Sequence, residues 1–579
     1  MKKVVFLCLS LWFICSCKAQ LSYTNLNGLW IGFELSNNAV SIVSISSGSS
    51  SLAVLPDTIS GSPITSIKGG AIAYSYKPSS FYMPNTVTNI GNSAFAYNSN
   101  LTNISFSTTL KNIGYRAFYG CSNAVINLPA SVENIEEEAF ANCSKITNLI
   151  LSATNVGRMA FYNCDLYNLT LTDSVKKIDM YTFSENKNLT NIYIGSGLSS
   201  LGSYNVPFRG SASLKQINVS GLNLYFSSED GILFTKNKSE LILYPANKNT
   251  PTYSLPTNTV NIQNYAFLGN QHLTQLNLNS AIWGIAYAAL SGCVSLTNIY
   301  VPENNSRYST QDGVLFNKAI TELERYPPAR TNKTYRIPIT VIKLLDNSFS
   351  DSQQLETLNI PSNVTTIGHY AFSKSKKITN FVFEGSVSLI GGSAFNECSA
   401  LEEIILPNGI TEIPALLLQN SHVLKRVYIP ESVNLIRQNA FIFNTNLIGI
   451  YFKGNAPSIE YGPVIIGNEY KSLTFANTNA TVYFKSDKGN WSNKFDVLNT
   501  SNWVSTIDTC ITISQNSSNP NFNELRIRAK KGETARVFFS SDLTNWNIYT
   551  SFNGADQEEV IPILNDSNLQ KMFFRLNTQ

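Results

Sequence analysis

The sequence predicts a mainly β solenoid of about fourteen stacked coils of 21–25 residues, followed by a small C-terminal β-sandwich. Three observations predict this fold: an Ala-Phe pair that recurs at short intervals, apolar positions that keep a fixed offset from each pair, and a tail in which the period stops. At 579 residues the chain is also too long for one ordinary core.

The phenylalanine of the Ala-Phe pair marks each coil. The markers are Phe95, Phe118, Phe140, Phe161, Phe183, Phe208, Phe267, Leu290, Phe349, Phe372, Phe395, Leu418 and Phe441, and Ile72 opens the series. A coil this short cannot bury its own apolar face, so coils stack and place like residues above like. The spacing therefore predicts a column of buried Phe rings.

Two gaps between markers are longer, each 59 residues, which is 23 plus an insertion of 36. The two insertions match one another at a constant offset of 82 residues. The matching pairs are Asp230-Gly231 with Asp312-Gly313, Tyr244 with Tyr326, and Tyr253 with Tyr335. Because Asp-Gly is a strong signal for a two-residue hairpin loop, each insertion is predicted to contain a strand pair.

Six residues after most markers the pattern Leu-x-x-Leu-x-Leu begins, as in "LTNISF" and "LTNIYI". Its alternation is that of a half-buried strand, with the x residues on the outer face. Amides, hydroxyls and tyrosines on such a face suit recognition of a protein or a glycan. The candidate binding residues are Tyr193, Tyr300, Tyr428, Tyr451, Asn103, Asn148, Asn191, Asn298 and Asn380.

The segments "MPNTVTNIGNSAF", "LPASVENIEEEAF" and "IPSNVTTIGHYAF" resemble the BspA-like leucine-rich repeats of bacterial cell-surface proteins. The resemblance covers the predicted leucine-rich repeat domain (51–505). The short strands predicted before it form an N-terminal β cap (20–50), and the end of the period predicts a C-terminal β module (506–579). That family is implicated in adhesion and in binding to host or matrix. The resemblance therefore implies a protein or glycan partner.

Residues 1–19 read as an export signal: Met1-Lys2-Lys3 is positively charged, and the apolar run that follows is too short to span a bilayer. Cleavage after Ala19 would release a soluble chain. Alternatively, "ICSC" resembles a bacterial lipobox, which would make Cys17 a lipidated N-terminus. The expected location is secreted or at the cell surface, as an outer-membrane lipoprotein in the second case, with membrane contact only through that anchor.

Other chemistry finds little support in the sequence. Charged residues make up 14%, the net charge is +4 and no long basic run occurs, so nucleic acid is not an expected partner. Five cysteines stand three residues after a marker, where other coils have Asn, which predicts buried unpaired thiols. Their spacing matches no zinc pattern, the three histidines are scattered, and no cofactor or metal is expected.

Glu402-Glu403 are the most conspicuous carboxylates, and one coil later the same positions hold Lys425-Arg426. We expect ion pairs between neighbouring strands here rather than an acid/base couple. The sequence thus predicts a non-enzymatic, adhesin-like binding protein that uses the exposed strand face. The alternative is a structural spacer that presents the C-terminal module, with an enzyme a distant third.

Overall fold

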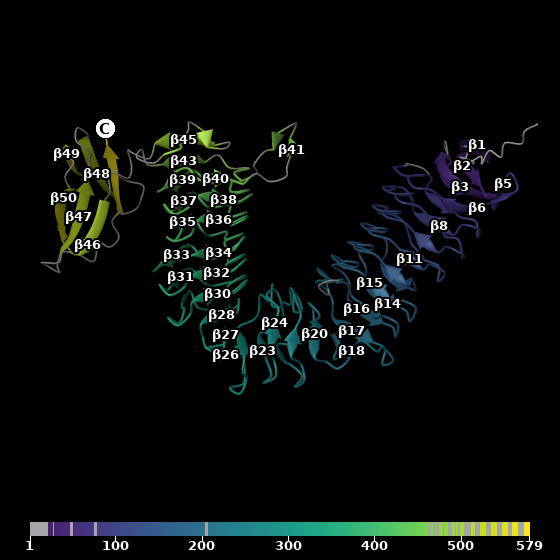
Figure 1. Cartoon of the computed structure of the whole chain (residues 1–579), viewed down its shortest axis with the longest axis horizontal. Coiled ribbons are helices and arrows are strands. Elements are labelled where there is room, and N and C mark those ends of the chain that lie inside the picture. The colour runs from purple at the N-terminus through teal and green to yellow at the C-terminus, as the bar shows by residue number, and fades with distance from the viewer. Residues whose placement is uncertain are drawn as a thin grey trace, which may run out of the picture. The chain divides into compact units, whose positions relative to one another are not determined.

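We describe a computed structural model of the chain (Figure 1) over residues 21–26, 28–46, 50–74, 78–202 and 206–460, parts of 465–502, and six strands between 511 and 578. The predicted signal segment 1–19, with Cys17, lies outside the described residues. Every regular element of the described chain is a β-strand. The chain forms two compact units, one of residues 1–319 and 327–329 and the other of 320–326 and 330–579.

The first unit begins with three antiparallel strands, β1 (Leu21–Leu26), β2 (Leu29–Ser36) and β3 (Ala39–Ser46). Strand β3 then pairs in parallel with β6 (Ser62–Ile67), which also carries the short antiparallel β5 (Thr58–Ile59). Because β6 pairs with the first repeat strand, β8 (Asn89–Ile90), one hydrogen-bond ladder runs from this meander into the coils.

Each coil contributes two short strands, and each kind stacks in parallel on its own kind. The isoleucine strands lie just before the markers and end in an apolar residue that is buried in most of them. In the first unit they are β8, β10 (Asn112–Ile113), β11 (Asn134–Ile135), β13 (Asn155–Val156), β15 (Lys177–Ile178), β22 (Asn261–Ile262) and β24 (Gly284–Ile285). The parallel stacking confirms the solenoid.

The leucine strands follow the markers and come from the Leu-x-x-Leu-x-Leu pattern, apart from β4, which precedes the first stretch of that pattern. In the first unit they are β4 (Leu52–Val54), β7 (Ser80–Tyr82), β9 (Asn103–Ser105), β12 (Asn148–Leu151), β14 (Asn168–Leu171), β16 (Asn191–Ile194), β17 (Gln216–Val219), β21 (Thr252–Ser254), β23 (Gln275–Asn277) and β25 (Asn298–Tyr300). Their registers place like positions side by side, for example Leu149 with Leu169 and Leu169 with Ile192.

The predicted column of Phe rings is confirmed. From Phe95 to Phe208 neighbouring markers stack with ring centroids 4.8–5.7 Å apart, and all are buried. The chain turns tightly around each Ala-Phe pair: Ser93 and Tyr97, two residues on either side of Phe95, have φ of 55° and 60°. The next coil lies close to this turn, because the Ala117 carbonyl accepts the Phe95 N–H at 2.7 Å. The small Ala side chain leaves room for this approach.

Both predicted hairpins are present. Strand β18 (Phe226–Glu229) pairs antiparallel with β19 (Ile232–Thr235), and β26 (Tyr308–Gln311) pairs with β27 (Val314–Asn317). Their Asp-Gly loops have positive φ at both residues, 49° and 74° in one and 48° and 75° in the other, as a type I′ turn requires.

The structure also shows how each 59-residue gap is divided. After the first hairpin, β20 (Glu240–Leu243) leads to Tyr244, which stacks on Phe267 at 4.8 Å and so takes a marker's place. In the second unit Tyr326 stacks on Phe349 at 5.1 Å in the same way. Each gap is therefore a 36-residue coil that carries the hairpin, followed by a regular coil of 23 residues.

The second unit repeats this arrangement. Its isoleucine-type strands are β28 (Glu322–Arg325), β30 (Lys343–Leu344), β32 (Thr366–Ile367), β34 (Leu389–Ile390), β36 (Glu412–Ile413), β38 (Leu435–Ile436) and β40 (Ser458–Ile459). Its leucine strands are β29 (Thr334–Arg336), β31 (Thr357–Ile360), β33 (Asn380–Phe383), β35 (Glu403–Ile405), β37 (Arg426–Ile429), β39 (Gly449–Phe452) and β43 (Thr481–Phe484). Phe475 stacks on Phe441 at 5.5 Å, which adds a marker that the sequence analysis did not include.

After the last coil the strands no longer follow the repeat. Strand β45 (Leu498–Asn502) joins β43 in parallel and β44 (Lys494–Phe495) antiparallel, and β41 (Ile465–Ile466) pairs with β42 (Glu469–Tyr470). The C-terminal module consists of two three-stranded antiparallel sheets, as expected of a small sandwich. One holds β46 (Ile511–Gln515), β47 (Phe522–Arg528) and β50 (Glu558–Leu564); the other holds β48 (Thr534–Ser540), β49 (Asn547–Asn553) and β51 (Phe573–Thr578).

Candidate binding surface

The x residues of the leucine strands form an outer face, as the alternation predicts. In β12, Leu149 and Leu151 are buried, whereas Asn148 and Ile150 are exposed. Parallel pairing in register turns each x position into a column of side chains that runs from coil to coil. Two candidate residues therefore lie side by side only if they occupy the same column on neighbouring strands.

The predicted asparagines are only partly brought together. Asn148 and Asn191 belong to one amide ladder through Asn168: the Asn168 amide donates to Asn148 at 2.7 Å, and the Asn191 amide donates to Asn168 at 3.0 Å. Asn103, Asn298 and Asn380 lie at the same position of other strands, opposite Ser80, Gln275 and Thr357 respectively.

A second amide ladder lies on the isoleucine strands, where the sequence analysis named no candidates. It joins Asn89, Asn112, Asn134 and Asn155 through side-chain hydrogen bonds of 2.6, 2.9 and 2.9 Å. The signal was present in the sequence, because "NI" or "NV" recurs before four successive markers. Such ladders satisfy amides along the coil stack and so stabilise the solenoid.

The predicted tyrosines separate into two groups. Tyr193 and Tyr300 are 44% and 52% exposed, and their in-register neighbours are Thr170 with Asn218, and Asn277. Tyr428 and Tyr451, in contrast, stack on each other with ring centroids 4.8 Å apart and an angle of 16° between the rings.

Tyr483 of β43 continues this second group, with its ring 4.7 Å from that of Tyr451 at 9°. The three residues form what we call the tyrosine column, and the exposed Ile405 stands in register at its N-terminal end. The period of the repeat does not predict Tyr483, because 34 residues, rather than 23, separate Phe441 from the next marker, Phe475. The strand pattern "ATVYF" was the available signal.

Local sequence explains how the rings lie. A Cβ added to Gly449 would come within 2.7–2.9 Å of the Tyr451 ring and hydroxyl, so this ring leans along its own strand over the glycine. Gly449 pairs with Arg426, which precedes Tyr428 by two residues.

The pKa values of two residues of the tyrosine column are raised. Burial is the main cause that raises the pKa of Tyr428 to about 12; the neighbouring Glu403 carboxylate and Tyr451 raise it further, and Arg426 lowers it. The pKa of Tyr451 is raised too, again mainly by burial.

The charged residues beside the column form the predicted pairs. Arg426 contacts Glu403 at 3.4 Å across the strands β35 and β37, and Lys425 contacts Glu402 at 2.7 Å just before them. All four side chains are between 43% and 64% exposed, so these pairs contribute little to stability. The predicted ion pairing of these carboxylates between neighbouring coils is thus confirmed.

The cysteines of the repeats are buried and form no disulfide bond, as predicted. Each donates its S–H to the carbonyl of the marker in the preceding coil, for example Cys121 to Phe95 at 3.0 Å and Cys398 to Phe372 at 3.3 Å. Burial raises the pKa of Cys121, Cys164 and Cys398 to about 12. These thiols are therefore structural groups rather than nucleophiles.

Among the described residues, no group of three or more His, Cys, Asp or Glu side chains is arranged to hold a metal ion. The same part of the chain contains no helix long and apolar enough to cross a membrane.

The family pattern of the "BspA type Leucine rich repeat region (6 copies)" matches residues 65–154, 111–229, 245–323 and 329–448. No curated protein matches this chain. A solved leucine rich cell surface protein from Faecalibacterium prausnitzii A2-165 is 23% identical, with 75% of this chain and 95% of that chain covered and a TM-score of 0.36. The pneumococcal vaccine antigen PcpA is 20% identical over 75% and 94%, with a TM-score of 0.37. Since the family pattern covers more than half of its residues, this chain belongs to the BspA type leucine-rich repeat family.

Proposed function

We propose that the protein is a secreted or surface-displayed, non-enzymatic binding protein that acts like an adhesin. The observation that carries the proposal is the tyrosine column, a row of three stacked, partly buried aromatic rings beside the exposed Ile405 and the Arg426–Glu403 pair. Tyrosine and arginine are enriched at the energetic centres of protein interfaces, because they supply contact area together with hydrogen bonds. Export rests on the sequence of residues 1–19, with Cys17 as the alternative lipid-anchored end.

Given the chemistry that this strand face offers, a protein partner suits the column better than a glycan. Sugars stack on the faces of aromatic rings, but the faces of Tyr451 are covered by Tyr428 on one side and by Tyr483 on the other. The column therefore offers ring edges and hydroxyls, which favour contact with a partner's side chains and backbone. Glycan binding remains the second candidate because the amide ladder of Asn148, Asn168 and Asn191 offers the donors and acceptors that it would need.

The test compares full-length variants on an array of purified matrix proteins, host-cell surface proteins and glycans. Tyr428→Ala/Tyr451→Ala/Tyr483→Ala should lower the affinity for a protein bound by the wild type about thirtyfold, the effect of removing about 2 kcal/mol at a hot spot. Tyr193→Ala/Tyr300→Ala removes the same chemical group from isolated positions and should lower it less than threefold.

Equal circular dichroism spectra and urea midpoints would show that both variants are folded. Unchanged binding by the triple variant would contradict the assignment to the column. The alternative function, a structural spacer that presents the strands between 511 and 578, predicts that result, because neither set of tyrosines would then contact the partner.

A further inference from the structure

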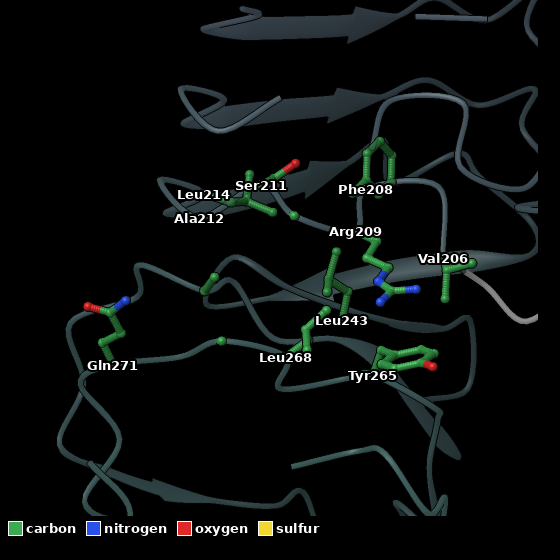
Figure 2. A pocket seen from close by; sticks show the side chains of 13 residues that line it. Val206, Phe208, Arg209, Ser211, Ala212, Leu214, Leu243, Tyr265, Leu268 and Gln271 are labelled. Carbon is green, nitrogen blue, oxygen red and sulfur yellow. The ribbon is translucent and has the colours of Figure 1, made fainter. Parts of the chain in front are cut away.

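A cavity of about 180 Å³ lies in the first unit beside the first hairpin-bearing coil. Figure 2 shows its lining, which is mainly apolar and includes Phe208, Leu214, Leu243 and Leu268. It lies where the Phe column is interrupted, since the 36-residue coil separates Phe208 from the next marker, Tyr244. An apolar cavity of roughly 150 Å³ is large enough to hold one benzene ring.

Ser211, which also lines the cavity, has a buried hydroxyl with no hydrogen-bond partner. It stands three residues after its marker, where other coils satisfy the same group: the Ser421 hydroxyl donates to the Phe395 carbonyl at 3.2 Å, and Cys121 donates to Phe95 at 3.0 Å. A buried polar group without a partner is rare and calls for an explanation, such as a bound molecule that the structure does not contain. A ligand with a polar end would satisfy it.

Arg209 supplies a positive charge to the same lining. Its guanidinium lies over the ring of Tyr265 at 5.0 Å and over that of Tyr181 at 6.0 Å, and Figure 2 shows it between Phe208 and Tyr265. Among the ion pairs of the described residues none involves Arg209, although the Glu185 carboxylate lies close to Gly210. Held on two rings, the guanidinium keeps its planar donors for a carboxylate.

We propose that this cavity binds a small apolar monocarboxylate, such as an arylcarboxylate or a short fatty acid. The apolar group occupies the space between Leu243 and Leu268, and the carboxylate pairs with Arg209. The site is independent of the tyrosine column, so the proposal stands or falls separately from the proposed function.

The chain itself supplies the control variants, because each lining residue has a counterpart 82 positions later. Leu243 corresponds to Arg325, Leu268 to Ser350 and Gly269 to Asp351, and there the buried Arg325 guanidinium contacts Ser350 at 2.6 Å and Asp351 at 3.8 Å. Gly269 has φ +73° and Asp351 has φ 62°, so an aspartate can adopt the backbone of this position. The variant Leu243→Arg/Leu268→Ser/Gly269→Asp should therefore fill the cavity with a side-chain arrangement that the fold already uses.

The experiment titrates the full chain with 4-fluorobenzoate and, as the neutral analogue, 4-fluorobenzyl alcohol, followed by ¹⁹F NMR. The wild type should bind the carboxylate saturably, with a Kd of roughly 1–5 mM for a ligand of this size. Arg209→Ser, which introduces the counterpart residue Ser291, should weaken the carboxylate at least tenfold and change the alcohol less than twofold. The cavity-filling variant should bind neither probe.

Circular dichroism and urea midpoints report whether each variant folds, and Arg209→Ser tests the proposal even if the triple variant does not. Absence of saturable binding by the wild type up to 20 mM would overturn the proposal, as would equal carboxylate affinity in the wild type and in Arg209→Ser.

Discussion

The two 59-residue segments, from Phe208 to Phe267 and from Leu290 to Phe349, are two copies of the same long repeat. They share their strands and turns but differ in some of their interior side chains. Both carry a hairpin closed by Asp-Gly, and both place a tyrosine where a marker is expected. They also share a backbone hydrogen bond: the Asn247 N–H donates to the Leu214 carbonyl at 2.7 Å, and the N–H of its counterpart Ala329 donates to the Leu296 carbonyl at 2.9 Å. At the counterpart positions, however, the first copy has Leu243 beside a cavity and the second has the buried Arg325.

This difference shows which parts of the repeat are fixed by the fold and which are free to vary. The turn and the marker ring are held in both copies, because the backbone path and the stacked core depend on them. The residue before the marker tyrosine is free, since the wider coil leaves space that either an apolar side chain or a satisfied guanidinium can occupy. New sites can therefore arise where the period is interrupted without a change in the solenoid.

The largest effect is expected from removing the marker tyrosine that both copies share. Tyr244→Ala and Tyr326→Ala each delete a buried ring that stacks on the next marker, so each should lower the free energy of unfolding by about 3–5 kcal/mol. Urea denaturation followed by tryptophan fluorescence measures both. Values that differ by more than about 2 kcal/mol between the copies would show that the two cores are not equivalent.

The next largest effect is expected at the residue that differs between the copies, which is Leu243 in the first and Arg325 in the second. Arg325→Leu gives the second copy the first copy's residue but leaves Ser350 and the mostly buried Asp351 without their guanidinium partner. We expect a loss of about 3 kcal/mol in the free energy of unfolding. The variant Arg325→Leu/Ser350→Leu/Asp351→Gly, which transfers the whole set, should recover most of that loss, and a triple variant no more stable than the single one would argue against independent interiors.

A smaller effect tests the shared hairpin loop. Gly231→Ala and Gly313→Ala put a Cβ on residues with φ of 74° and 75°, so each should cost about 1–2 kcal/mol. A Cβ on Gly231 would in addition approach the Gln216 Cβ to 2.9 Å. Thermal unfolding of both variants gives the comparison, and a gain in stability from either would contradict the type I′ geometry.

The smallest effect is a dependence on pH at the alkaline end. Burial raises the pKa of Tyr244 to about 12, and it raises that of Tyr326 as well, where Arg330 partly opposes the shift. Because the folded chain then holds these protons more tightly than the unfolded chain, stability is fully present below about pH 10 and decreases as the pH rises toward 12. Absorbance at 295 nm, with Tyr244→Phe and Tyr326→Phe as references, should show Tyr326 ionising first; the reverse order would contradict the role of Arg330.

Much of the fold could be predicted from the sequence because it depends on periodic apolar residues. The spacing of Ala-Phe predicts the ring column, Asp230-Gly231 predicts its hairpin, and Glu403 opposite Arg426 predicts an ion pair. Each of these follows from one coil lying directly on the next, so position in the repeat is enough to place the residue.

The candidate sites were less predictable because they arise where the period fails. Tyr483 lies beyond a coil of irregular length, so counting from Phe441 does not place it beside Tyr451. The cavity depends on the volume left between Phe208 and Tyr244, and the spacing of residues in the sequence does not predict that volume. Tyr193 and Tyr300 share a repeat position with Tyr428, but their columns hold Thr and Asn instead of further rings.

The most direct test of the comparison between the copies is a crystal structure of the full chain under xenon pressure, because xenon enters apolar cavities without requiring a polar contact. We expect a xenon atom beside Leu243 and Leu268 in the first copy and none beside Arg325 and Ser350 in the second. Xenon at both positions, or only beside Arg325, would contradict the conclusion that the two copies differ in this interior.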